Sequence, residues 1–108
     1  MNDALTSQLT EVGLTRNEAI AYVCLLEADD SSGLTGYEVA ARSGVPRSAV
    51  YGVLRKLETA GAAFANGEKP ARYVAVSPSQ LVEGMRARTR IKMDRLDDSL
   101  ARVSVRER

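Results

Sequence analysis

The 108-residue sequence predicts a mainly α-helical domain with a small β-hairpin at residues 1–76, followed by a long helix at residues 77–108. Three observations predict this fold class. Helix-starting motifs recur along the chain, and residues with β-propensity lie beside a polar turn. The stretch after Pro78 has an apolar repeat at helical spacing and no further proline. A chain of this length suffices for one domain with a modest core and one appended element.

Three helix starts have the spacing of a capping box, in which two side chains three residues apart cap each other's backbone N–H groups. The pairs are Thr15 with Glu18, Thr35 with Glu38, and Ser77 with Gln80. An apolar residue precedes each pair and can pack onto the first turn of the helix. We therefore expect helices at about residues 16–28 and 78–105, and two more within residues 35–60. The shared face of Leu5, Leu9 and Val12 predicts a further helix at about residues 3–12.

Residues 35–61, TGYEVAARSGVPRSAVYGVLRKLETAG, are the most informative segment. The pattern predicts two helices joined by a tight turn, and small Ala40 and Gly44 are expected to let them approach each other. The second helix, at about residues 46–60, has two faces when residues are spaced at 100°. Its apolar stripe comprises Val50, Val53, Leu54 and Leu57, and its polar stripe comprises Arg47, Ser48, Tyr51, Gly52 and Arg55. This pattern is typical of a helix-turn-helix, whose second helix enters the DNA major groove.

The polar stripe predicts which residues read DNA bases. Arginine can bind guanine O6 and N7 through two hydrogen bonds, and serine and tyrosine hydroxyls can bind bases or phosphates. Glycine at position 52 removes bulk from the same face, so that a DNA backbone can come close. We assign base reading to Arg47, Ser48, Tyr51 and Arg55. Two alternatives stay open, because Tyr51 can pack its ring on the hairpin and Arg55 can pair with Glu58.

Residues 62–76 predict the hairpin, with AAFAN and ARYVAV as short strands around the polar turn GEKP. A hairpin after a helix-turn-helix forms a wing, so the predicted domain is a winged helix-turn-helix. The first strand contains few residues with high β-propensity, since Ala62 and Ala63 stand at its start. We assign contacts with the DNA backbone to Thr35, Lys56, Lys69 and Arg72. For the last three, simple solubilising charge is the alternative.

The final helix is too long to pack along its whole length on so small a domain, since about 28 residues of helix span roughly 42 Å. Pro78 suits the first helical position, where its missing N–H is not needed. Met93, Leu96, Leu100 and Val103 follow the three-four-three spacing of a short coiled-coil seam, which Val82 and Met85 extend. We expect this helix to be a dimerisation arm. A helix packed partly on its own domain is the alternative.

Charge is distributed unevenly behind a net charge of +1. Residues 1–41 carry one basic and seven acidic side chains, residues 42–72 carry six basic and two acidic ones, and residues 73–108 carry eight basic and five acidic ones. A protein that binds a polyanion needs a basic face rather than a basic total. The segregation therefore permits a DNA-binding face around the helix-turn-helix.

Composition argues against several classes of function. The sequence has no histidine and one cysteine, so it lacks zinc-ligand spacings and cannot form an intramolecular disulfide. We expect no metal, no cofactor and no enzymatic activity, and we expect Cys24, Tyr22 and Tyr37 to serve the core. No apolar run approaches the roughly 20 residues that span a bilayer, and the N-terminus lacks the features of a signal peptide. We therefore expect a cytoplasmic protein without membrane contact.

The sequence resembles the TrmB-like winged-helix family of archaeal and bacterial transcription regulators. The resemblance rests on GLTRNEAIAYVCLLEA at residues 13–28, on the helix-turn-helix segment above, and on ARYVAVSP before the long helix. Its most specific part is SGVPRSAVYGVLRKLE. The resemblance implies a dimeric repressor or activator that binds promoter DNA. Two points differ from the family: Ala62 and Ala63 replace a larger apolar residue, and the sugar-binding effector domain of larger members is not carried over to this chain.

These observations together predict a homodimeric transcription regulator that binds double-stranded DNA at a pseudo-palindromic operator. The recognition helix at about residues 46–60 would lie in the major groove, and the wing at about residues 62–76 on the flanking backbone. The alternative is a winged-helix adaptor for protein–protein interaction that does not bind DNA. An adaptor predicts an apolar or acidic face on the second helix, and the basic face counts against it.

Overall fold

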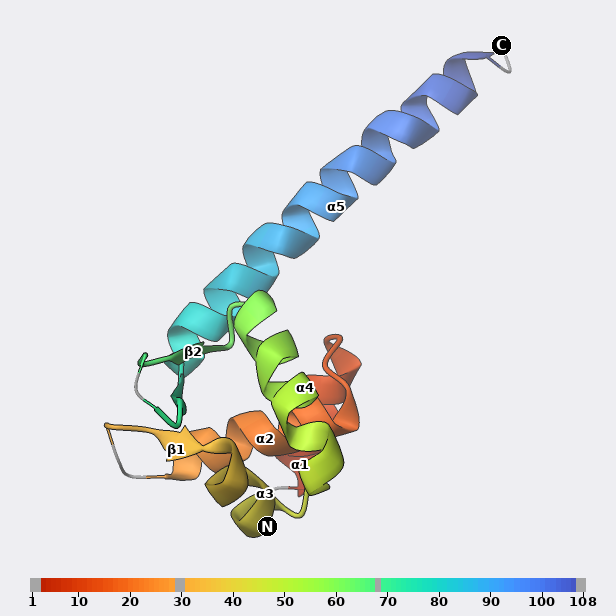
Figure 1. Cartoon of the computed structure of the whole chain (residues 1–108). Coiled ribbons are helices and arrows are strands. Elements are labelled where there is room, and N and C mark those ends of the chain that lie inside the picture. Colours follow the sequence, from red (N-terminus) through yellow and green to blue (C-terminus); the bar gives the residue numbers. More distant parts are fainter. Residues whose placement is uncertain (1–2, 29–30, 68, 107–108) are drawn as a thin grey trace. The chain divides into compact units, whose positions relative to one another are not determined.

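The computed structural model describes residues 3–28, 31–67 and 69–106 (Figure 1). The chain forms two compact units, Met1–Ser77 and Pro78–Arg108. The first unit contains α1 (Asp3–Glu11), α2 (Arg16–Glu27), β1 (Leu34–Thr35), α3 (Gly36–Ser43), α4 (Arg47–Thr59), β2 (Ala63–Ala65) and β3 (Arg72–Ala75), and the second is the single helix α5 (Pro78–Arg106). The predicted fold class, mainly α with a small β component and a long C-terminal helix, is confirmed.

Two of the predicted capping boxes are formed. The Thr15 hydroxyl oxygen accepts the N–H of Glu18 at 3.2 Å, and the Glu18 carboxylate accepts the N–H of Thr15 at 3.0 Å. Thr35 and Glu38 exchange the same two bonds at 3.1 and 2.9 Å. Each box satisfies backbone donors that a helix start leaves without an intrahelical partner. Helices α2 and α3 therefore begin where the sequence predicts.

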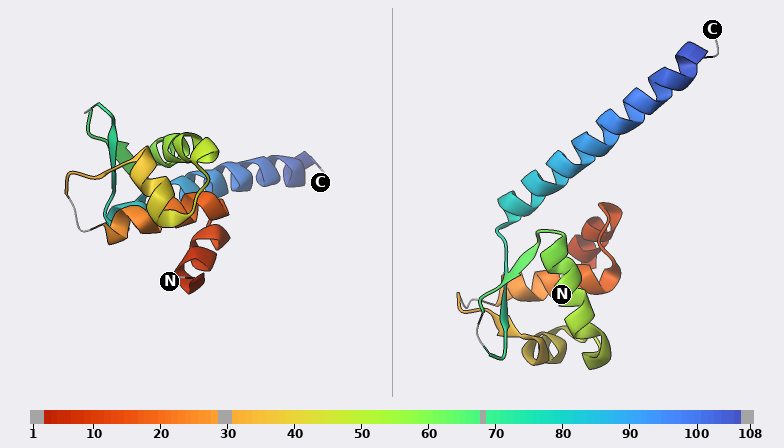
Figure 2. Two further views of the ribbon diagram at one scale, coloured as in Figure 1. Left: turned by 60° about the horizontal axis from the view of Figure 1, so that its bottom comes forward. Right: turned by 45° about the horizontal axis from the view of Figure 1, so that its top comes forward.

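The core of the winged unit lies among α2, α3 and α4, and the small sheet lies at one side of these helices (Figure 2). The predicted apolar stripe of α4 is buried, as expected, at Val50, Val53, Leu54 and Leu57. Tyr22 on α2 is also buried, and its hydroxyl donates to the carbonyl of Val76 at 2.9 Å. Burial raises the pKa of this hydroxyl. Cys24 is half-buried, and burial raises the pKa of its thiol.

The predicted hairpin is part of a three-stranded antiparallel sheet in the order β1-β3-β2. Strands β2 and β3 pair with Phe64 opposite Val74. The first strand of the hairpin forms although it has few residues with high β-propensity, because Ala62 and Ala63 are buried beside the core. Tertiary packing thus overrides a weak local preference.

Strand β1 is an addition to the prediction. Leu34 lies opposite Tyr73 and Thr35 lies opposite Arg72. The approach is close at Gly33, where a Cβ would stand 2.5 Å from the carbonyl oxygen of Tyr73, and where the backbone has a φ of +85°. Only glycine satisfies both conditions without strain. The strand connects the wing to the start of the helix-turn-helix.

The turn between α3 and α4 depends on Gly44, which has a φ of +82° and donates its N–H to the carbonyl of Ala40 at 3.1 Å. The hydroxyl of Ser43 accepts the N–H of Val45 in the same turn. A Cβ at position 44 would meet nothing within 4 Å. The expectation that Gly44 lets the two helices approach is therefore wrong. Glycine is required here for the left-handed backbone conformation that ends α3.

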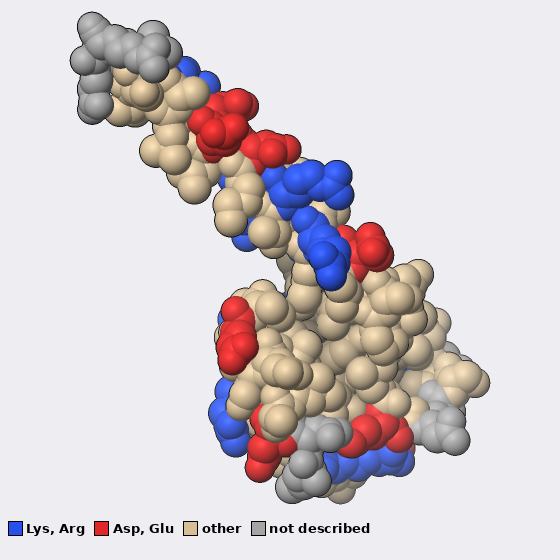
Figure 3. All heavy atoms as spheres, turned by 180° about the vertical axis from the view of Figure 1, so that it is seen from behind, with Lys and Arg blue, Asp and Glu red and all other residues tan. Residues whose placement is uncertain are grey.

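Helix α5 begins at Pro78, as predicted, and spans 29 residues, whereas the capping box at Ser77 and Gln80 stays a prediction. The predicted seam is exposed to solvent at Val82, Met93, Leu96, Leu100 and Val103. Acidic and basic side chains alternate in patches along it, with Glu83 first, then a basic cluster at residues 86–92, then acidic side chains at residues 94–98, and then Arg102 (Figure 3). None of the helices in the described ranges combines the length and the apolar character that crossing a membrane requires.

Candidate nucleic-acid interface

Helix α4 brings the four predicted base-reading residues to one exposed face. Arg47, Ser48, Tyr51 and Arg55 are all exposed, whereas the apolar stripe of the same helix is buried. A Cβ at Gly52 would meet nothing within 4 Å, so there is room for a small side chain at this half-buried position. Arg55 and Glu58 both belong to the described residues, and no ion pair joins them.

The start of α4 is left without a side-chain cap. Its N-cap residue is Pro46, and no side-chain hydrogen bond is made there. Helix α3, by contrast, starts with the capping box of Thr35 and Glu38. The N–H groups in the first turn of α4 lie at the positive end of the helix dipole and are not capped by a side chain. They therefore favour the binding of an anion such as phosphate.

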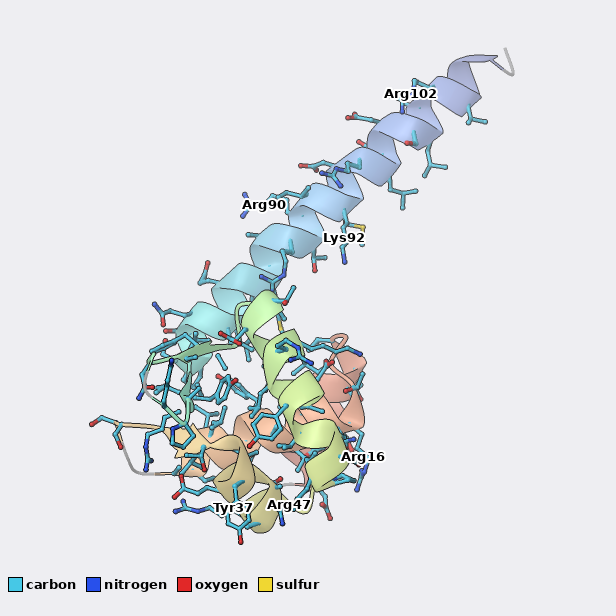
Figure 4. All side chains as sticks on the ribbon, in the orientation of Figure 1. Arg16, Tyr37, Arg47, Arg90, Lys92 and Arg102 are labelled. Carbon is cyan, nitrogen blue, oxygen red and sulfur yellow. The ribbon has the colours of Figure 1, made fainter. Side chains whose placement is uncertain are left out.

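Arg47 stacks on Tyr37 across the start of the two helices (Figure 4). The carbon at the centre of the guanidinium lies 4.7 Å from the centroid of the tyrosine ring. Tyr37 is 57% exposed, so the expectation that it serves the core is wrong. The helical period could have shown this, because the buried positions of α3 are Gly36, Val39 and Ala40, and Tyr37 lies about 60° outside the edge of their stripe at 100° per residue. Sequence reasoning thus missed a residue of this surface.

Tyr51 packs against the first residue of α3. Its ring lies over Gly36, where a Cβ would stand 2.5 Å from a ring carbon of Tyr51. The structure records this contact with α3, and the alternative that Tyr51 packs its ring on the hairpin stays a prediction. Tyr51 as a whole remains 53% exposed. Glycine at position 36 thus leaves room for the Tyr51 ring at the start of α3.

The wing is fastened to the loop before β1 at the base of its turn. The side-chain amide of Asn66 donates to the carbonyl of Ser32 at 3.0 Å, and its oxygen accepts the N–H of Arg72 at 3.3 Å. The N–H of Asn66 also donates to the carbonyl of Arg72 at 2.9 Å. Lys69 lies beyond these bonds in the turn and is exposed. The Lys69 side chain is therefore accessible for the predicted contact with the DNA backbone.

Arg72 bonds within the protein. Its guanidinium donates to the carbonyl of Gly33 at 3.0 Å and to the carboxylate of Glu38 at 3.4 Å. The pKa of Glu38 is lowered, first by the N–H of Thr35 and further by the neighbouring Arg72, which outweigh partial desolvation. Arg72 thus joins the wing to α3, a role that sequence reasoning missed because it depends on the unpredicted pairing of β1. Its contact with DNA stays a prediction.

The geometry described above fits a known family of regulators. Residues 9–79 match the model of the family described as sugar-specific transcriptional regulator TrmB. This chain belongs to the TrmB family. The match spans α2, the helix-turn-helix and the wing, and it confirms the resemblance that the sequence motifs predicted.

Two relatives cover most of this TrmB-family chain. It is 34% identical over 97 residues to the uncharacterized protein YrhO of Bacillus subtilis (strain 168), a match that covers 90% of the chain and 34% of YrhO. It is 29% identical over 86 residues to TrmBL1, an HTH-type sugar sensing transcriptional regulator of Pyrococcus furiosus, which covers 80% of the chain and 24% of TrmBL1. The chain thus spans about a third or less of the length of these relatives.

The chain is also similar to solved structures of other proteins. The chain matches TrmBL2, an archaeal chromatin protein with a novel mode of DNA binding, with a TM-score of 0.80 and 30% identity over 97% of the chain and 40% of TrmBL2. It matches CouR of Rhodococcus jostii RHA1 with a TM-score of 0.55 and 20% identity, over 90% of the chain and 78% of CouR. The second match shows the fold alone. The named relatives of known role in the TrmB family are DNA-binding proteins and transcription regulators rather than enzymes.

Proposed function

We propose that this chain binds double-stranded DNA sequence-specifically as a homodimer and thereby regulates transcription. The observation that carries the proposal is the division of α4 into a buried apolar stripe and an exposed stripe with two arginines, a serine and a tyrosine. Such a helix can be anchored on one side and can enter the major groove with the other. Membership of the TrmB family supports the same function.

The first turn of α4 would face the base edges. Arg47 and Ser48 lie there, next to N–H groups that no side chain caps, and these groups favour a nearby phosphate. Tyr51 and Arg55 follow one and two turns later on the same exposed face. An arginine in this position can bind guanine through two hydrogen bonds, so Arg47 is the strongest candidate for base discrimination.

The flanking phosphates would be contacted by Thr35, Lys56, Lys69 and Arg72. Lys56 and Lys69 are exposed and can reach a phosphate without breaking a bond that the structure records. The Thr35 hydroxyl oxygen already accepts the N–H of Glu38, although its proton can still be donated. Arg72 is the weakest of the four candidates, because its guanidinium is bonded to Gly33 and Glu38.

Helix α5 would pair with a second copy of itself. Its exposed seam lies within a sector of about 80° at 100° per residue, and a second copy supplies the same stripe to cover it. Lys92 and Asp97 flank the seam on opposite sides, so that two parallel copies bring opposite charges together across it. A two-fold dimer with recognition helices about one DNA turn apart, roughly 34 Å, would bind a pseudo-palindrome.

Selection of bound sequences from random double-stranded DNA tests the DNA-binding part of this proposal. We expect enrichment of a pseudo-palindrome, with a slope of log K against log salt near −0.9 for each phosphate contacted. The mass of the free protein, measured on the same sample by sedimentation, should be that of a dimer. No enriched sequence together with a flat salt slope would overturn the proposal and favour the protein-interaction adaptor.

Two substitutions separate base reading from backbone contact. Arg47→Ala should relax the preference at one base pair of each half-site, because it removes a base-edge contact. Lys69→Ala should weaken binding to all sequences about equally and should lower the salt slope by about one, because it removes a phosphate contact. Equal effects of the two substitutions on every sequence would contradict the assignment of Arg47 to base reading.

A further inference from the structure

The exposed surface around the start of α4 contains a side chain whose place is not explained by the core. Tyr37 is the second residue of α3, and more than half of its surface is exposed. Within the described part of the chain its hydroxyl makes no recorded hydrogen bond, so it does not complete a buried network. The interaction that the structure records for its ring is the stack with Arg47.

The stack limits the directions in which Arg47 can point. An exposed arginine otherwise samples many rotamers, and two hydrogen bonds to one guanine require the planar guanidinium in a defined orientation. A guanidinium that lies over an aromatic ring keeps the N–H groups at its edge available, because stacking uses its face. Tyr37 therefore restricts Arg47 without occupying the donors that a base would bind.

The platform beneath Arg47 is itself held by the fold. Gly36 and Tyr37 are the first two residues of α3, whose start is fixed by the capping box of Thr35 and Glu38. The ring of Tyr51, from α4, lies over Gly36. The described part of the chain records no carboxylate bonded to Arg47 that would compete with the stack. The ring is thus the recorded constraint on this guanidinium.

We propose that Tyr37 is a positioning residue that sets the base preference of Arg47 by holding its guanidinium on the tyrosine ring. The inference rests on the proposed DNA-binding function. It assigns Tyr37 no base contact of its own, so the ring is required and the hydroxyl is not. Tyr37 then acts on specificity while nonspecific binding to the phosphate backbone is unchanged.

The test uses the full chain and the duplex selected by the wild-type protein, together with a duplex changed at the base pair whose preference Arg47→Ala relaxes. Tyr37→Ala is expected to reduce the affinity ratio of the two duplexes by about two- to fivefold, the size of an exposed cation–π contact. Tyr37→Phe is expected to keep the wild-type ratio, because phenylalanine retains the ring. In the Arg47→Ala background, Tyr37→Ala should have no further effect on the ratio, because the two residues act through one contact.

A spectroscopic measurement examines the stack without DNA. The ring current of Tyr37 should shift the side-chain proton resonances of Arg47 upfield, and this shift should persist in Tyr37→Phe and disappear in Tyr37→Ala. The melting temperatures of the variants should stay near that of the wild type, because Tyr37 is exposed. A melt that is unchanged while the affinity ratio falls separates positioning from a general loss of fold.

Three results would overturn the inference. They are an unchanged affinity ratio in Tyr37→Ala, an equal fall in the Arg47→Ala background, and tighter specific binding by Tyr37→Ala, which would mean that the stack holds Arg47 away from the base. Any of these results with a wild-type protein that still discriminates between duplexes leaves the proposed function intact. A wild-type protein that binds no DNA selectively would instead overturn the proposed function itself.

Discussion

The winged unit and helix α5 place apolar side chains in opposite environments. Leu54 and Leu57 on α4 are fully buried, whereas Leu96 and Leu100 on α5 are 53% and 58% exposed. All four have the same side chain and stand at helical spacing. The difference teaches that an apolar stripe at helical spacing can have two roles. In α4 the other elements of the winged unit bury the stripe, and in α5 we infer that a second copy of the chain covers it.

The largest expected effect comes from truncating a buried side chain in the core of the winged unit. Leu54→Ala should lower the free energy of unfolding by about 2–5 kcal/mol, because it removes a fully buried side chain and leaves a cavity. Leu96→Ala is the matched change in α5 and should alter the stability of the monomer by less than about 0.5 kcal/mol. Urea denaturation of both variants at low protein concentration measures the two changes in the free energy of unfolding. Equal losses would remove the distinction between the two regions.

A charge in the seam of α5 should act on association rather than on folding. Leu96→Asp should weaken the proposed dimer by more than about tenfold, because the seam would have to bury an ionised carboxylate. Ile91→Asp is the control: Ile91 has nearly the same exposure, 51%, and lies roughly opposite the seam on the helix. Sedimentation equilibrium gives both dissociation constants. Similar constants for the two variants would show that the seam is not the interface.

Adding a methyl group at Gly52 should separate stability from DNA affinity. Gly52→Ala should raise the stability of the winged unit by about 1 kcal/mol, since alanine favours a helix and the Cβ meets nothing within 4 Å. The same Cβ should weaken DNA binding if the face enters the groove. Gly84→Ala on α5 is the matched control, with a gain in helix propensity and no change in affinity. Calorimetry and fluorescence anisotropy measure the two quantities, and unchanged affinity in Gly52→Ala would argue against close approach at this position.

The smallest expected effect is the pH dependence that Glu38 contributes. Its pKa lies below the usual glutamate range, because its carboxylate accepts the N–H of Thr35 and faces Arg72. A lowered pKa stabilises the folded state above the unfolded pKa, and this contribution is lost as the pH falls through the folded value. Glu38→Gln should therefore be less stable than the wild type at neutral pH, and the difference should shrink in acid.

Thermal unfolding at several pH values tests this behaviour. Glu18→Gln is the matched control, because Glu18 closes the other capping box and glutamine retains an acceptor oxygen in both variants. A difference between Glu38→Gln and the wild type that stays constant from neutral to acid pH would contradict the role of the Glu38 charge.

The parts of the fold that depend on neighbours in sequence were predictable. The boxes at Thr15 and Thr35 require only residues three positions apart, and the buried stripe of α4 follows from the helical period. Strand β1 was not predictable in this way, since two residues show no alternation, and Leu34 pairs with Tyr73, which lies 39 residues further along the chain.

The candidate interface was predicted in part. The shared exposed face of the four α4 residues followed from the phase of the helix, and their contact with DNA stays a prediction. Tyr37 was placed in the core on residue type, although the helical phase points it outward. The bonds of Arg72 depend on Gly33 and Glu38, which are far from it in sequence, so local reasoning had no access to them.

The bonds that fasten the wing have a consequence for the thermodynamics of recognition. Asn66 holds the wing to the loop at Ser32, and Arg72 holds it to Gly33 and Glu38 beside α3. A flexible wing would lose conformational entropy when it met a ligand, and that loss would oppose binding. Here the ordering occurs during folding, before any ligand arrives. Complex formation by this unit should therefore show the small heat-capacity change of two preformed surfaces rather than the large one of a segment that folds as it binds.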